Sequence, residues 1–281
     1  NNWEGYFSKI IVADLTNDKS IRKLSSLQIE AIIHLVSLND IDSSKDIKKA
    51  SDVNILTTWR LLQEFSPKGL KCFIYFSTIH VYDHSHQDKV TEKTNTSPQS
   101  IYGLTHLLSE NICNFYHQNY DTQCINVRLS NSYGEPIFPD AKCWDLIVNN
   151  LTRSAFLNKK IVLKSDGEPI RDLIHFSDIC NGVGKLINLS SKIESNNTFH
   201  FCSSKSISML SIAFKIQKVY EQIYGDKIPI FINTNQIYNK KDKIEKSKKT
   251  FSNDLAYHNS IVFKKELKEG IKDLFNYFEI Q

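Results

Sequence analysis

Short apolar runs alternate with longer amphipathic stretches through the first half of the chain. The apolar runs are rich in β-branched and aromatic residues, and they predict strands at residues 9–13 (KIIVA), 31–36 (AIIHLV), 72–76 (CFIYF) and 123–127 (QCINV). The stretches between them predict helices at residues 44–65 and 101–120. Because strands that alternate with helices form parallel sheets covered by helices, we predict an α/β fold.

From residue 131 onward the spacing of these elements changes. The pattern predicts helices at residues 144–158, 178–189 and 208–224, a strand at residues 160–163 and a turn at residues 166–167. No internal repeat and no Pro/Gly-rich linker separates the two parts. We therefore expect two lobes, residues 1–130 and 131–281, that are interleaved rather than independent.

The segment at residues 97–106, SPQSIYGLTH, places a tyrosine and a histidine four positions apart on a predicted helix. Side chains at i and i+4 share one helix face, so Tyr102 and His106 can touch the same ligand. Ser97 is the expected helix cap, and Pro98 is the expected first-turn residue. The apolar residues of this helix form a stripe that we expect to face the core, away from Tyr102: Leu104, Leu108, Ile112 and Phe115.

Composition and charge exclude some partners. The 281-residue chain is 41% hydrophobic and 23% charged, as in an ordinary globular protein. Its net charge of +4 equals the excess of six lysines over two acids at residues 240–249, which we interpret as a solvated loop. Basic residues are not interleaved with aromatic residues over a face, so we expect no nucleic-acid partner.

Six cysteines are scattered without C-x-x-C pairs or nearby histidines at metal-ligand spacing. This argues against a disulfide framework and a zinc site, and we expect no metal. No apolar run approaches the roughly 18 residues that span a bilayer, and the first residues lack the plan of a signal peptide. We therefore expect a cytoplasmic protein with no membrane partner.

The pair Tyr102 and His106 resembles the Tyr-x-x-x-Lys element of the extended short-chain dehydrogenase/reductases, the NAD-dependent epimerase/dehydratase family, with histidine in place of lysine. Further segments resemble this family in the same order: VADL (residues 12–15), IHLV (33–36), Asn54 in VNILTT, FSTIHVY (76–82), RLSNSYGEP (128–136) and GEPIRDLIHFSD (167–178). The resemblance implies a Rossmann-type doubly wound parallel sheet with a smaller C-terminal α/β substrate lobe. Residues 1–130 would be a partial dinucleotide-binding domain, and residues 131–281 would be mostly the substrate-binding lobe.

One part of the family pattern is absent. The nine glycines form no G-x-x-G-x-x-G or G-x-G-x-x-G motif, whose backbone N–H groups bind the pyrophosphate. In the family order, residues near Asp14 belong to the third strand, so the N-terminal βαβ portion is missing from this chain. The missing first strand is central in the strand order 3-2-1-4-5-6. We expect an N-terminal extension on the order of 50 residues in the natural protein, or a partner that fills the gap.

The resemblance also implies roles for individual residues. Tyr102 would exchange a proton with a sugar hydroxyl, and Thr78 would hydrogen bond to the same oxygen. His106 would replace the lysine that holds the nicotinamide ribose, and His80 would be a ring acid/base or only line the sugar pocket. The other implied positions are cofactor contacts at Asp14, Leu35, Val36 and Asn54, with Tyr102 and His106, and substrate contacts at Asn131, Tyr133 and Arg171. Arg171 would meet the diphosphate, unless Asp172 holds it in an ion pair.

Histidine in place of lysine at position 106 affects how well Tyr102 can act as a base. A tyrosine with an ordinary pKa near 10 must be made more acidic to work near neutral pH. A protonated His106 would supply the charge of the lysine, whereas a neutral one would leave Tyr102 a poorer base. We therefore expect reduced or acid-shifted activity. The sequence Thr78, Ile79, His80 lacks the Thr-Asp-Glu of the family's 4,6-dehydratases, which disfavours that reaction.

We interpret the chain first as a nucleotide-sugar epimerase that oxidises sugar C4 transiently with tightly held NAD or NADP, in polysaccharide or lipopolysaccharide sugar biosynthesis. An NAD(P)-dependent nucleotide-4-keto-sugar reductase is one alternative. A catalytically impaired family member that binds nucleotide-sugars is another. The resemblance further implies a homodimer packed through the helices at residues 44–65 and 101–120.

Overall fold

The computed structural model describes residues 7–24, 26–83, 89–193, 197–233, 236–237 and 250–280. The chain divides into unit 1 (residues 1–85, 92–129 and 183–200) and unit 2 (residues 86–91, 130–182 and 201–281). The lysine-rich segment at residues 240–249 lies outside the described residues. No helix in the described ranges has the length and apolar character needed to cross a membrane.

A four-stranded sheet in the order β1-β2-β4-β8 organises unit 1. Its strands are β1 (Ala31–His34), β2 (Cys72–Thr78), β4 (Gln123–Leu129) and β8 (Thr198–Phe201), the last of which ends at the boundary with unit 2. β1 and β4 both run parallel to β2, with Ala31 and Gln123 opposite Cys72. The three predicted strands at residues 31–36, 72–76 and 123–127 are thus confirmed, as is the parallel sheet.

The strand predicted at residues 9–13 is wrong. These residues form no strand, and Ile10, Ile11 and Val12 are exposed. A strand needs a neighbour to receive its backbone hydrogen bonds, and this segment pairs with none of the described strands. Within the described residues, β1 pairs on one side only, with β2, and its Ile33 is also exposed.

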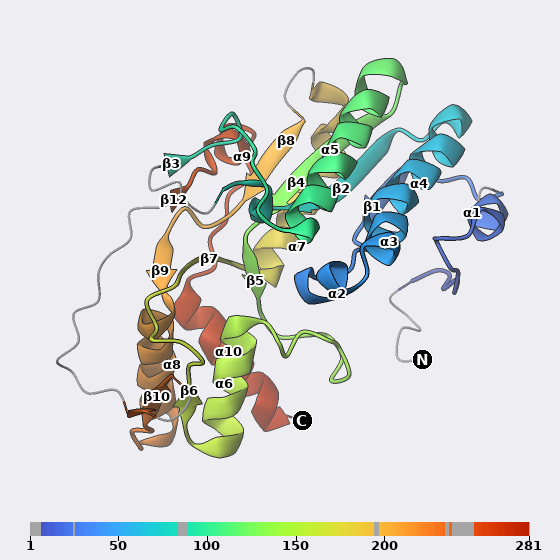
Figure 1. Cartoon of the computed structure of the whole chain (residues 1–281). Coiled ribbons are helices and arrows are strands. Elements are labelled where there is room, and N and C mark those ends of the chain that lie inside the picture. Colours follow the sequence, from blue (N-terminus) through green and yellow to red (C-terminus); the bar gives the residue numbers. More distant parts are fainter. Residues whose placement is uncertain are drawn as a thin grey trace. The chain divides into compact units, whose positions relative to one another are not determined.

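Unit 1 also contains helices, of which α5 packs directly on β2 and β4 of the sheet (Figure 1). They are α1 (Asp18–Leu24), α2 (Asp40–Lys45), α3 (Ile47–Ala50), η1 (Ser51–Leu56), α4 (Thr57–Phe65), η2 (Ser66–Lys68), η3 (Ile79–Val81), α5 (Ile101–Asn119) and η4 (Ser190–Lys192). The predicted helix at residues 44–65 is therefore present in segments, with the π-helical turn η1 in its middle. Leu62, Phe65 and Phe73 lie in the core between α4 and the sheet.

Helix α5 corrects two sequence predictions. Its cap is Ser100, whose Oγ accepts a hydrogen bond from the N–H of Gly103 at 3.1 Å, and not Ser97. The apolar stripe that we expected to face the core is exposed at Leu104, Leu108 and Phe115, by 41–54%. The opposite, polar face is buried instead, because its side chains find partners there.

The buried face of α5 is held by an ion pair with β4. Glu110 accepts hydrogen bonds from Nε and Nη2 of Arg128 at 2.9 and 2.6 Å, and from Oγ of Ser77. Nη1 of Arg128 also donates to the hydroxyl of Tyr82. Bidentate, fully hydrogen-bonded pairs of this kind can be buried because each charge is compensated. This network orients the helix that carries Tyr102 and His106.

In the described part of unit 2 there are three small sheets and five helices. The strands are β3 (Lys89–Val90) with β12 (Thr250–Phe251), β5 (Asn131–Tyr133) with β7 (Ile170–His175) and β9 (Ser206–Ser208), and β6 (Ile161–Val162) with β10 (Ile230–Ile232) and β11 (Gln236–Ile237). The helices are α6 (Ile147–Asn158), α7 (Phe176–Leu189, which continues into unit 1), α8 (Met209–Tyr224), α9 (Asp254–His258) and α10 (Leu267–Ile280). Leu151, Ile216 and Phe275 form part of the apolar core where α6, α8 and α10 meet.

The predictions for this part of the chain are confirmed at the level of elements. The helices predicted at residues 144–158, 178–189 and 208–224 correspond to α6, α7 and α8, and the strand at residues 160–163 corresponds to β6. The turn at residues 166–167 contains Gly167 with a φ of 91°, a left-handed conformation that glycine adopts without strain. All six cysteines are free thiols.

Candidate active site

Tyr102 lies in the first turn of α5, directly before a glycine that allows a close backbone approach. A Cβ at Gly103 would sit 2.3 Å from the carbonyl oxygen of His80, so no other residue fits between α5 and the turn η3. This contact brings Tyr102 beside Thr78, which ends β2 and caps η3. The Oγ1 of Thr78 accepts a hydrogen bond from the N–H of His80 at 3.2 Å.

Three of the predicted catalytic residues surround the phenol of Tyr102. Burial raises the pKa of Tyr102, and a hydrogen bond with the Thr78 side chain partly offsets that rise. The rings of His80 and His106 lie edge-on to Tyr102, at centroid distances of 5.9 and 4.5 Å. The structure therefore brings Tyr102, Thr78, His80 and His106 together within unit 1.

His106 does not supply the charge of a lysine. Its side chain is 1% exposed, and burial, with smaller effects of His34 and His80, lowers its pKa to about 3. Its Nδ1 lies 2.8 Å from the hydroxyl of the buried Tyr75. The imidazole is therefore neutral at pH 7, and the expectation of an acid-shifted activity loses its basis, because no group here becomes cationic just below neutrality.

Two buried imidazole nitrogens in this cluster have no hydrogen-bond partner among the described residues: Nε2 of His106 and Nε2 of His34. His34 ends β1, its ring lies 5.8 Å from that of Tyr75, and burial lowers its pKa to about 4. Buried polar atoms are almost always satisfied in folded proteins, so this pair fits a bound molecule that carries hydroxyl groups. A nicotinamide dinucleotide, with its ribose hydroxyls, meets that requirement.

Sequence reasoning missed His34 and Tyr75 as site residues. Each is a polar side chain within an apolar strand, AIIH and CFIYFST, and a buried polar group needs a partner. That signal was present in the sequence. The sequence does not show which residue is the partner of Tyr75, because Tyr75 and His106 are 31 residues apart and meet only through packing of α5 on β2.

The predicted cofactor contacts have different surroundings. Leu35 and Val36 follow β1 directly and are exposed. Asn54 is fully buried in η1, where its Oδ1 accepts from the N–H of Leu38 at 2.7 Å and its Nδ2 donates to Thr105 at 2.9 Å. Asn54 thus fixes the loop after β1 against α5. Asp14 is exposed and its carboxylate closes a turn by accepting from Thr16, which lowers its pKa.

The predicted substrate residues lie in unit 2. Arg171 is exposed, and its Nη1 donates to the carbonyl of Ile170 at 2.8 Å. Asp172 is bound by the N–H and hydroxyl of Ser203, at 2.8 and 3.2 Å, and not by Arg171. Burial raises the pKa of Asp172 to about 6. Asn131 is half-buried and its Nδ2 donates to the carbonyl of Asp172 at 2.9 Å.

Tyr133 belongs to the core of unit 2. Its side chain is 1% exposed, and its ring packs edge-on against His175 at a centroid distance of 5.1 Å. Burial raises the pKa of its hydroxyl, so the phenol stays protonated. We therefore keep Asn131 and Arg171, but not Tyr133, among the proposed substrate contacts.

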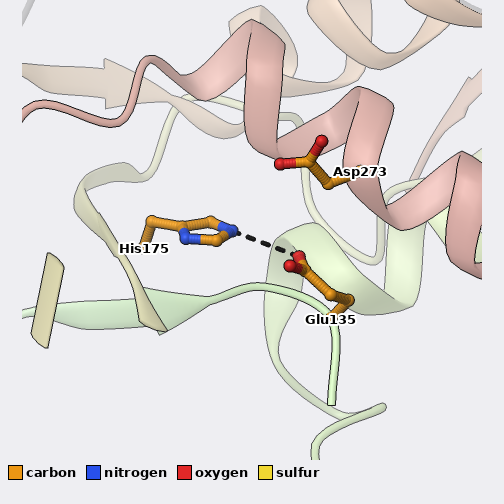
Figure 2. Close-up of side chains that lie close together, drawn as sticks. All are labelled: Glu135, His175 and Asp273. Carbon is orange, nitrogen blue, oxygen red and sulfur yellow. Dashed lines mark ion pairs between the residues drawn. The ribbon is translucent and has the colours of Figure 1, made fainter. Parts of the chain in front are cut away.

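His175, Glu135 and Asp273 form a cluster of ionisable side chains (Figure 2). Nε2 of His175 lies 3.3 Å from Oε2 of Glu135, and this contact lowers the pKa of Glu135. Nδ1 of His175 accepts from the N–H of Ser177 at 3.2 Å, which leaves the ring proton on Nε2. A nitrogen that carries a proton cannot ligate a metal. Asp273 pairs with Nζ of Lys265 at 2.5 Å, so we interpret the cluster as one ion pair beside a neutral histidine that faces a carboxylate.

Comparison with known proteins decides the family. Residues 1–202 match the NAD dependent epimerase/dehydratase family. The chain belongs to this family. Its members are NAD-dependent enzymes, so the predicted family, enzyme class and nicotinamide cofactor are confirmed at that level.

Two relatives show the range within the family. The chain is 28% identical over 201 residues to the uncharacterized UDP-glucose epimerase YtcB of Bacillus subtilis, covering 71% of this chain and 60% of that protein. It is 26% identical over 201 residues to the dTDP-D-glucose 4,6-dehydratase of Dictyostelium discoideum, covering 67% of this chain and 44% of that protein. The chain thus spans about half the length of these relatives.

Solved structures agree on the fold. The UDP-glucuronic acid 4-epimerase from Bacillus cereus, in complex with UDP-glucuronic acid and NAD, has a TM-score of 0.75 at 22% identity, covering 95% of this chain and 80% of that one. At this identity the likeness establishes the fold, and the predicted Rossmann-type α/β architecture is confirmed. The expected N-terminal extension stays a prediction.

Proposed function

We propose that this protein is an NAD-dependent nucleotide-sugar epimerase that oxidises the sugar at C4 transiently. The contact between Tyr102 and Thr78, with His106 one helical turn away, carries the proposal. It provides one group that can exchange a proton with a hydroxyl and a second that can hydrogen bond to the same oxygen. UDP-sugars are the first substrates to test, because UDP-glucose or UDP-glucuronic acid is named for two of the similar proteins.

In this proposal NAD, when bound, supplies the acceptor for the hydrogen on C4 and later returns it. Tyr102 takes the proton of the C4 hydroxyl as the C4–O bond becomes a carbonyl, and it gives the proton back when hydrogen returns to the other face of C4. Thr78 holds the same oxygen in both steps. The net reaction inverts C4 and consumes no cofactor, so its atoms and electrons balance.

Each unit carries candidate ligand contacts of its own. In unit 1, His106 would contact the cofactor's ribose, and Leu35 and Val36 would lie along the cofactor after β1. In unit 2, the guanidinium of the exposed Arg171 would engage a diphosphate bidentately. Asn131 would line the sugar.

The direct test is product analysis. Full-length protein is incubated with NAD and, separately, UDP-glucose and UDP-glucuronic acid, and the sugar products are separated by chromatography and identified by proton NMR. We expect the C4 epimer, with no net change in absorbance at 340 nm. Oxidation of added NADH by a nucleotide-4-keto-sugar, with no epimerisation, would favour the reductase instead.

One observation favours the impaired family member. His106 is neutral, and burial raises the pKa of Tyr102, so the protein alone does little to prepare the base. Binding of a UDP-sugar and NAD without turnover, measured by calorimetry across pH 6 to 9, would support that alternative. Turnover that responds to Tyr102→Phe would exclude it.

We also propose a homodimer. Trp59 on α4 and Leu104, Leu108 and Phe115 on α5 are 41–54% exposed, and large apolar side chains gathered on packed helices are typical of an interface. The expected partner is a second copy through the same face. Leu104→Glu with Leu108→Glu should convert a dimer to a monomer in sedimentation analysis, whereas a native protein that is monomeric at all concentrations would contradict the proposal.

A further inference from the structure

The hydroxyl of Tyr75 has one main acceptor within reach. Tyr75 is 1% exposed in the middle of β2, and its Oη lies 2.8 Å from Nδ1 of His106. Burial raises the pKa of Tyr75, so the phenol keeps its proton and must donate it. Ser109 also contacts this hydroxyl, but its own proton goes to the carbonyl of Asn54, 2.7 Å away.

These contacts decide which nitrogen of His106 carries the proton. A hydroxyl oxygen is a weaker acceptor than the lone pair of a neutral imidazole, so Tyr75 donates to Nδ1 of His106. A neutral ring has a single N–H, which is then at Nε2. That Nε2 is buried and has no partner among the described residues, so it is a donor held ready for an acceptor that binds later.

We propose that Tyr75 is a positioning residue that fixes His106 in the Nε2–H tautomer, so that a neutral imidazole donates one hydrogen bond to a ribose hydroxyl of the bound dinucleotide. This inference rests on the proposed function for the identity of the ligand. It explains how a histidine serves at position 106 without a positive charge: a fixed tautomer replaces the hydrogen bond that the lysine gives to the ribose. Tyr75 acts through His106 and does not touch the cofactor.

The tautomer can be measured without any activity assay. Long-range proton–nitrogen NMR spectra of the ¹⁵N-histidine-labelled full-length protein report which ring nitrogen is protonated, and His106→Gln identifies the His106 signals among nine histidines. We expect the proton on Nε2 and a hydrogen-bonded Nδ1, unchanged between pH 5 and pH 8. In Tyr75→Phe the Nδ1 signal should move to that of a nitrogen without a donor.

Cofactor binding gives the second readout. Glutamine at position 106 can place an amide N–H where Nε2 lies, whereas asparagine reaches only the position of Nδ1. We expect His106→Gln to keep the dissociation constant for NAD within about threefold, and His106→Asn and Tyr75→Phe to weaken it about three- to tenfold, the value of one neutral hydrogen bond. Ser109→Ala is the matched control, because it touches Tyr75 but leaves the contact with His106 in place.

Both experiments can overturn the proposed role of Tyr75. A proton on Nδ1 in the native protein, an unchanged spectrum in Tyr75→Phe, or tighter NAD binding by His106→Asn than by His106→Gln would overturn it. If the native protein binds no NAD although the spectra show the expected tautomer, the proposed function and the ribose contact are contradicted, while the positioning of His106 by Tyr75 stands. Thermal melting of each variant confirms that it is folded.

Discussion

Two buried histidines, one in each unit, have opposite surroundings. His106 in unit 1 has one nitrogen on Tyr75 and the other without a partner. His175 in unit 2 has Ser177 on one nitrogen and Glu135 at 3.3 Å from the other. Both side chains are at most 3% exposed. Burial alone therefore does not identify a functional histidine. Nε2 of His106 faces no charged group among the described residues, which indicates a ligand, whereas Nε2 of His175 lies 3.3 Å from a carboxylate, although it makes no hydrogen bond there, which indicates a structural role.

The largest predicted effect is a loss of kcat when Tyr102 is replaced, because its ring packs on His106 and is the proposed base. Tyr102→Phe removes the proposed proton-transfer group and should lower kcat by about 100- to 10,000-fold, the usual contribution of general acid–base catalysis. Tyr116→Phe, a buried tyrosine later on α5, is the control and should keep kcat near the native value. Equal losses in both variants would remove the catalytic role of Tyr102.

The next effect is a difference between His175 and His106 in how much each contributes to the free energy of unfolding. His175→Gln removes the ring that packs between Tyr133 of β5 and Gly270 of α10 and that contacts Ser177. It should lower the free energy of unfolding by about 3 kcal/mol, since it opens space in the core and leaves polar groups unpaired. His106→Gln breaks one contact and should cost about 1 kcal/mol. Urea unfolding measures both, with Trp59 reporting on unit 1 and Trp144 on unit 2. A larger loss for His106→Gln would reverse the comparison.

Acid should weaken unit 1 through its neutral histidines. The pKa values of His34 and His106, about 4 and about 3, lie below the ordinary value near 6.5, so the unfolded chain takes up protons first. Their stabilisation is complete above pH 6.5 and is lost as the pH falls toward 4. At pH 5 each loss is about 2 kcal/mol.

The measurement is urea unfolding at pH 5 and pH 7 in the native protein and in His34→Gln. The variant should lose about 2 kcal/mol less between the two pH values. Asp172 acts in the opposite sense in unit 2, because its raised pKa of about 6 stabilises the fold at low pH and ceases to do so as the pH rises past 6. An identical loss in native protein and His34→Gln would contradict a neutral, buried His34.

The smallest predicted effect concerns charge at position 106. Because His106 is neutral and the pKa of Tyr102 is raised, native activity should increase toward alkaline pH. His106→Lys adds a cation beside Tyr102 and should raise turnover at pH 7 by up to about tenfold, as expected if the pKa of Tyr102 falls by about one unit. His106→Met is the neutral control. A lysine variant with no gain at pH 7 would show that charge is not what the site lacks.

The sequence predicts most helices and strands but not which face of a helix is buried. Strong apolar runs located β2 and β4, and the i, i+4 spacing placed Tyr102 and His106 on one face of α5. The stripe of Leu104, Leu108 and Phe115 was assigned to the core because apolar faces usually turn inward. The buried pairs of Glu110 with Arg128 and of Ser109 with Asn54 reverse that assignment, and they depend on contacts between distant segments.

Contacts between the side chains of the site could not be predicted from the sequence either. The roles of Tyr102 and Thr78 follow from a family resemblance, but the pairing of Tyr75 with His106 depends on how far α5 is shifted along β2. Residues 9–13 failed as a strand for a related reason: local preference was present, and a pairing partner among the described strands was not. Local pattern therefore predicts elements, whereas hydrogen-bond partners require the packed structure.

The close approach that glycine permits at position 103 restricts movement between α5 and the turn after Thr78. With the helix backbone and the carbonyl of His80 in direct contact, the start of α5 and the turn after Thr78 cannot slide past one another. The phenol, the threonine hydroxyl and the neighbouring imidazole would therefore meet the proposed sugar as one preassembled group, and little entropy would be lost in gathering them when it binds.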